Sequence, residues 1–148
     1  RYGSVQDEPA VGTGELWMRI LLADDHPRVR FALCVLLEQQ PGLKVVGEAS
    51  DARDLLAQAA ATHPDLVLLA WELPGLAASG SLPALRKACP GLFVITLSGR
   101  PAARRAALAA GADAFVSKAE PPERLLSTIE DYCRRMRRVS PQSVETPR

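Results

Sequence analysis

The feature that most constrains the fold is a regular alternation of apolar runs with helix-like segments. Five runs of strand length alternate with five segments whose apolar residues recur at helical spacing. Such an alternation predicts a parallel sheet with helices packed on both faces and joined by right-handed crossovers. The expected strands are 18–23, 43–49, 66–70, 92–98 and 114–118, and the expected helices are 27–40, 51–63, 81–88, 102–110 and 122–138.

Local signals support several of these elements. Pro27 suits the first turn of the first helix, whose apolar stripe is expected at Val29, Leu33, Leu36 and Leu37. Asp51 is placed to cap the second helix. The third strand, LVLLA, is continuously apolar, which is typical of a strand buried on both faces.

Ligands of parallel sheets bind beyond the carboxyl ends of the strands, so the residues at those ends form the candidate site. Asp24 and Asp25 close the first strand, and a hard divalent cation such as Mg²⁺ would neutralise them. Ser98 and Lys118 close the fourth and fifth strands, and a hydroxyl and an ammonium group there suit a phosphoryl group beside a metal. Two alternatives remain: one aspartate caps the first helix while the other is solvated, and Lys118 pairs with Asp24 or Asp25.

Four stretches, in the order of the predicted strands, resemble the motifs of response-regulator receiver domains, especially those found ahead of LuxR/NarL-type helix-turn-helix modules. They are ILLADDHPRVR, PDLVLLAWELPG, VITLSG and GADAFVSK, and the resemblance covers Met18 to about Arg138. It implies a CheY-like, flavodoxin-like α/β fold, doubly wound, with a five-stranded parallel sheet in the order 2-1-3-4-5. It also implies a two-component signalling module that is not an enzyme.

The resemblance assigns roles to individual residues. It implies that Asp24 and Asp25 bind Mg²⁺, and that the backbone carbonyl of Glu72 helps to hold the ion. Ser98 and Phe115 occupy the two switch positions, and Lys118 matches the family's invariant lysine.

Ala70 departs from the family pattern. Receivers carry the phospho-accepting aspartate there, and a methyl group can neither attack phosphorus nor bind a metal ion. We therefore expect no catalytic residue and a weakened Mg²⁺ site, in which the longer side chain of Glu72 is a candidate replacement carboxylate. Two origins fit the alanine: a natural pseudo-receiver, or a designed Asp→Ala change.

The missing acceptor also has consequences for the switch. Without a phosphoryl group, Ser98 is expected to lack a charged partner, and Phe115 has no reason to turn inward. The acidic pair is expected to pair with Lys118 instead. Regulation would then come from protein partners, another ligand, abundance or dimerisation.

The expected partners are other signalling proteins, among them a histidine kinase, or a second copy of the chain. In the family, the surface of the fourth helix, fifth strand and fifth helix is a common dimer and output face. Here its mixed charges either form salt bridges across a twofold axis or stay solvated: Arg104, Arg105, Glu123, Arg124, Glu130 and Asp131. The arginines of 134–138 are interpreted as complementing the negative pole of the last helix, without direct binding of nucleic acid. A DNA-binding domain beyond Arg148 is compatible with the resemblance.

Composition and charge argue against several other classes of protein. A net charge of +1 favours neither nucleic acid nor an anionic membrane, and there is no membrane-spanning apolar run and no signal peptide pattern. Three scattered cysteines predict neither disulfides nor a zinc site and favour a reducing cytoplasm. Residues 1–17 are expected to be a flexible arm or a non-native remnant, 18–138 the receiver domain and 139–148 a tail or linker.

Two rival functions share the fold class: a flavodoxin-like small-molecule binder and a phosphatase-like hydrolase. The first needs a hydroxyl- or glycine-rich phosphate loop after the first strand, where this chain has the acidic DDHP. The remaining motifs of the second do not occur in the sequence. The signalling module is therefore the leading hypothesis.

Overall fold

The computed structural model describes residues 18–76 and 80–145, with side chains described as far as Met136. Strands and helices alternate in the predicted order. They are β1 (Met18–Ala23), α1 (Pro27–Glu38), β2 (Leu43–Ala49), α2 (Ala52–Thr62), β3 (Leu66–Ala70), α3 (Ser81–Ala88), β4 (Phe93–Ser98), α4 (Ala103–Ala109), β5 (Ala114–Ser117) and α5 (Pro122–Glu145). The expected arm of residues 1–17 lies outside the described residues.

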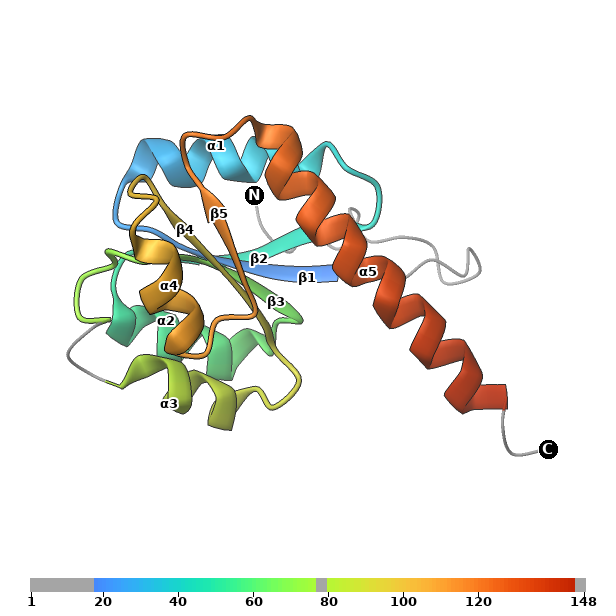
Figure 1. Ribbon diagram of the computed structural model, residues 1–148. Helices are drawn as coiled ribbons and strands as arrows, with labels where there is room; N and C mark the ends of the chain where they lie inside the picture. The colour runs from blue at the N-terminus through green and yellow to red at the C-terminus, as the bar shows by residue number, and fades with distance from the viewer. Residues whose placement is uncertain (1–17, 77–79, 146–148) are drawn as a thin grey trace. The chain divides into compact units, whose positions relative to one another are not determined.

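The strands form one parallel sheet in the order β2-β1-β3-β4-β5, which confirms the predicted doubly wound topology. Helix α1 covers one face, and α2 and α3 cover the other (Figure 1). All residues of the central strand β3 are buried. Val67 and Leu69 join a core that also contains Leu55 of α2, Leu85 of α3 and Ala107 of α4. Alternate side chains of β3 point to the opposite face, which explains the continuous apolar run.

The helix signals are confirmed in part. Pro27 lies in the first turn of α1, and the Asp51 side chain accepts a hydrogen bond from the Asp54 N–H at 2.8 Å at the start of α2. All four residues of the expected stripe in α1 are half-buried or buried, which confirms the predicted apolar face, and the buried Cys34 joins it without having been expected there.

The loop after β3 is held by a tight turn at Gly75. The Ala52 N–H donates to the Pro74 carbonyl oxygen at 2.9 Å, which ties this loop to the start of α2. Gly75 has a φ of +84°, and a Cβ atom added to it would lie 3.3 Å from Cβ of Ala52. Glycine is therefore favoured here by its positive φ, and a side chain would also be crowded against Ala52.

Residues 119–148 form a second compact unit, in which the structure describes α5 as far as Glu145. This helix continues beyond Arg138 and includes Pro141. The sequence contains no glycine there to end it. The arginines of 134–138 are therefore not in its last turn, and our interpretation that they complement its negative pole is wrong. Arg134 pairs along the helix with Asp131, while the side chains of Arg137 and Arg138 lie outside the described residues. The role of 139–148 as a tail or linker stays a prediction.

Among the helices described, none combines the length and the apolar character that crossing a membrane requires.

Candidate functional site

Four strands end at the same edge of the sheet and bring the predicted site residues together. Strand β3 lies between β1 and β4, so Ala70 at its end is flanked by Asp24, which follows β1, and by Ser98, which ends β4. Lys118 follows β5, and its backbone N–H donates to the Ser98 carbonyl oxygen at 2.8 Å. These contacts follow from the parallel register, which was the basis of the prediction.

The ammonium group of Lys118 is bonded directly to Asp24. Its Nζ atom lies 2.7 Å from Oδ2 of an aspartate that is only 2% exposed. Burial raises the pKa of the Asp24 carboxyl, but hydrogen bonds from Lys118 and from the His26 backbone outweigh it and leave this pKa below its ordinary value. Asp24 is therefore an ionised carboxylate held by a cation, and the expected pairing of Lys118 with the acidic pair is found at Asp24.

Asp24, Asp25 and His26 form a cluster whose ligand atoms all lie within 4.8 Å of one another. His26 Nδ1 lies 3.1 Å from Asp24 Oδ1 and 3.3 Å from Asp25 Oδ1, and the His26 N–H donates to Asp24 Oδ1 at 2.9 Å. This donor set fits Mg²⁺ poorly. The ion prefers several oxygen ligands, Ala70 offers none from its side chain, and both oxygens of Asp24 are already bonded to Lys118 and His26.

The carboxylate of Glu72 lies at a different place from this cluster. Its Oε2 atom accepts the Ser98 hydroxyl at 2.7 Å and two N–H groups of Arg100 at 3.0 and 3.1 Å. Burial raises the pKa of the Glu72 carboxyl, but the bonds from Ser98 and Arg100 outweigh it and lower this pKa. Our expectation that Ser98 lacks a charged partner is therefore wrong, because a neighbouring loop residue reaches it. A role of the Glu72 backbone carbonyl toward a metal stays a prediction.

Phe115 is buried, with 7% of its surface exposed, and belongs to the core beneath α2, α3 and α4. The guanidinium carbon of Arg104 lies 5.9 Å from the centre of its ring. The expectation that Phe115 has no reason to turn inward is wrong, because removing its large apolar surface from water is a sufficient reason.

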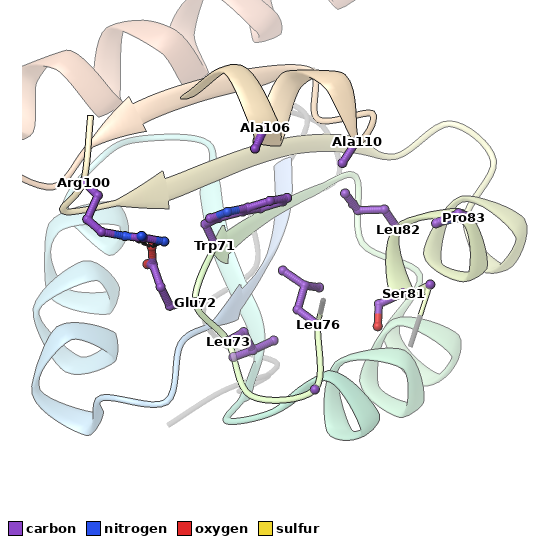
Figure 2. A pocket seen from close by; sticks show the side chains of 12 residues that line it. Trp71, Glu72, Leu73, Leu76, Ser81, Leu82, Pro83, Arg100, Ala106 and Ala110 are labelled. Carbon is purple, nitrogen blue, oxygen red and sulfur yellow. Dashed lines mark hydrogen bonds and ion pairs between the residues drawn. The ribbon is translucent and has the colours of Figure 1, made fainter. Parts of the chain in front are cut away.

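A cavity of about 640 Å³ lies beside this edge, between the loop after β3, α3 and α4 (Figure 2). Trp71, which directly follows Ala70, forms one wall, and Glu72 and Arg100 lie together at one end. This cavity, His26 and Arg100 were not predicted from the sequence. Their only sequence signal is position: His26 adjoins the acidic pair, and Arg100 follows Ser98 by two residues.

Comparison with known proteins identifies the family. Residues 20–130 match the response regulator receiver domain family. The nitrate/nitrite response regulator protein NarL of Escherichia coli K12 is 37% identical over 112 residues, which are 74% of this chain and 52% of that protein. The phosphate regulon transcriptional regulatory protein PhoB of the same strain is 33% identical over 131 residues, 86% of this chain and 55% of that protein. The chain thus spans about half the length of the curated relatives it matches.

Solved structures give the same result. A two-component response regulator of the LuxR family from Aurantimonas sp. SI85-9A1 has a TM-score of 0.72 at 32% identity, covering 78% of this chain and 84% of that one. The signal receiver domain of the putative response regulator NarL from Mycobacterium tuberculosis has a TM-score of 0.70 at 27% identity, covering 80% and 98%. Receivers are signalling domains and not enzymes, which sets the phosphatase-like alternative aside. The chain belongs to the response regulator receiver domains, of the NarL/LuxR type that serves two-component signalling.

Proposed function

We propose that this receiver domain signals without being phosphorylated. The observation that carries the proposal is Ala70 at the end of β3, where the resemblance implies the phospho-accepting aspartate. Its methyl group has no oxygen to attack phosphorus. The contact of Lys118 with Asp24 supports the same conclusion, because the ammonium group that would meet a phosphoryl group is engaged by a carboxylate.

Ser98 and Phe115, at the two predicted switch positions, are each held by contacts within the chain, which supports the proposal. Ser98 is completely buried and bonded to Glu72, and Phe115 is buried beside Arg104. Phosphorylation that does not occur cannot shift the balance between the two states, so a partner has to shift it by binding one state more tightly than the other. Mg²⁺ binds weakly at most under this proposal, since Ala70 removes one carboxylate.

The proposed mode of action is contact with other proteins in the cytoplasm. The partners are signalling proteins, a histidine kinase among them, or a second copy of the chain, as the resemblance to the family implies. PhoB is named a transcriptional regulatory protein, and the matched region is about half of it. Control of transcription through a DNA-binding domain outside this chain is therefore part of the proposal.

Phosphorylation chemistry tests the proposal directly. The chain and its Ala70→Asp variant are incubated with acetyl phosphate and Mg²⁺, and separately with beryllofluoride, and intact masses and the fluorescence of the two tryptophans are recorded. We expect no adduct on the unmodified chain and a phosphoryl adduct on Ala70→Asp. Ala70→Asn is the matched control, since it restores the size of the side chain without the carboxylate. A stable phosphoryl adduct on the unmodified chain would refute the proposal.

A further inference from the structure

The cavity beside Trp71 has the size and lining of a small-molecule site. Its volume of about 640 Å³ falls within the range of roughly 300–1,000 Å³ that such sites have. The Trp71 ring extends across it, and the buried side chains of Leu76 and Leu82 contribute apolar walls (Figure 2). On the α4 side, Ala106 and Ala110 present only methyl groups, which leave room for a ring against the indole.

The polar end of the cavity is electrically balanced. Glu72 and Arg100 are bonded to each other at 3.0 Å, so their charges cancel. An ionic group of a ligand would face the like charge of one of them or would have to break their pair. A hydroxyl or amide group, in contrast, is able to donate to the carboxylate and accept from the guanidinium without a net change in charge.

We infer that this cavity binds a neutral, flat and mainly apolar small molecule, a fused aromatic ring system with one hydroxyl or amide group, and that its binding is transmitted to Ser98 through Glu72. The ring system would stack on Trp71, and the polar group would reach the Glu72–Arg100 pair. The same Oε2 atom of Glu72 accepts the Ser98 hydroxyl at 2.7 Å. A ligand group that competes for this carboxylate therefore alters the hydrogen bond that holds the switch serine. The inference rests on the proposed function in one respect, that a receiver without phosphoryl input requires another input.

A titration with defined probes tests the inference. The 148-residue chain, labelled with ¹⁵N, is titrated with the neutral probes 2-naphthol and 2-naphthamide and with the anion 2-naphthoate. We expect both neutral probes to shift the Trp71 indole N–H and the amide signals of Ala106, Ala110 and Ser98 saturably, and naphthoate to bind roughly tenfold more weakly, a difference of about 1.4 kcal/mol. The inference is overturned if neither neutral probe gives saturable shifts, if naphthoate binds more tightly, or if the shifts cluster away from Trp71.

Matched variants on α4 locate the binding. Ala106 and Ala109 are both exposed, so leucine is tolerated at either position, but only Ala106 lines the cavity. Ala106→Leu should raise the Kd for 2-naphthol by roughly tenfold and Ala109→Leu should leave it within about twofold. Equal effects would contradict the site.

A third variant tests the transmission to the switch. In Glu72→Ala, 2-naphthol should still shift Trp71 but no longer Ser98, and a persistent shift of Ser98 would contradict the role of Glu72. Phosphorylation of the unmodified chain would remove the proposed function and leave these titrations unchanged, whereas failed titrations would leave the phosphorylation result unchanged.

Discussion

The Nζ atom of Lys118 lies 2.7 Å from Oδ2 of Asp24, although their strands, β5 and β1, are separated in the sheet by β3 and β4. Neighbouring strands are about 4.8 Å apart, so the two side chains together bridge the ends of both intervening strands. The two charges thereby neutralise each other at the edge where the family's phosphoryl group would be formed.

Removing the ammonium group should destabilise the fold. Lys118→Met leaves a nearly completely buried carboxylate without its cation, and we expect the free energy of unfolding to fall by about 1–3 kcal/mol, below the usual cost because Lys118 itself is partly exposed. Urea denaturation at neutral pH measures this change. The control is the double variant Asp24→Asn/Lys118→Met, which should recover part of the loss. Equal losses in the single and double variants would show that the ion pair is not the cause.

The stability of the fold should fall at acid pH as Asp24 becomes protonated. Its pKa is lowered in the folded chain from the ordinary value of 3.8, so the folded state holds this proton less tightly than the unfolded state. The resulting stabilisation is fully present above pH 3.8 and is lost as the pH falls through the lower folded pKa. Urea unfolding between pH 6 and pH 2 measures it, with these limits set about two units either side of the ordinary value of 3.8. Asp24→Asn should flatten the decline, and an unchanged pH profile would contradict the assignment.

The carboxylate of Glu72 should hold Ser98 in place. Glu72→Ala leaves the buried Ser98 hydroxyl without this acceptor, and we expect a loss of about 1 kcal/mol in the free energy of unfolding together with a shift of the Ser98 amide signal. Glu72→Gln keeps an acceptor oxygen and should retain most of the stability. If the glutamine and alanine variants behave alike, the hydrogen bond to Ser98 contributes nothing measurable.

Gly75 should tolerate no side chain without cost. Gly75→Ala would place a Cβ on a residue with φ of +84° and 3.3 Å from Cβ of Ala52, so we expect a loss of about 1–2 kcal/mol. Gly91 is the matched control, since a Cβ there meets nothing within 4 Å. Thermal unfolding of Gly75→Ala and Gly91→Ala compares the two positions, and a larger loss at Gly91 would contradict this account.

The contact of Arg104 with Phe115 should make a small contribution to stability. Arg104→Ala removes a cation that lies 5.9 Å from the ring centre, and we expect a loss of about 0.5–1 kcal/mol. Arg105→Ala changes the same charge on the same helix and should lose less. Urea denaturation of both variants separates the ring contact from the general effect of charge on α4.

The sequence predicted the fold and the position of the site well, for a physical reason. Apolar periodicity determines strands and helices, and the carboxyl ends of parallel strands meet at one edge, so Asp24 and Lys118 could be brought together without coordinates. Glu72 could not be placed, because it lies in a loop where periodicity gives no direction to a side chain. Phe115 was misjudged because it was expected to turn inward only in response to a phosphoryl group. The removal of its apolar ring from water is enough to account for its buried position. The continuation of α5 beyond Arg138 was missed because the polar residues 139–148 were expected to form a tail or linker.

The strand order has a consequence for how the chain folds while it is being synthesised on the ribosome. β1 is the neighbour of both β2 and β3, yet it is translated before either. Until residues 66–70 have emerged, one edge of this almost wholly apolar strand has no hydrogen-bonding neighbour, and such an edge invites pairing with other nascent chains. A ribosome that stalls before Leu66 would therefore release a fragment prone to aggregate, whereas completion of β3 protects it.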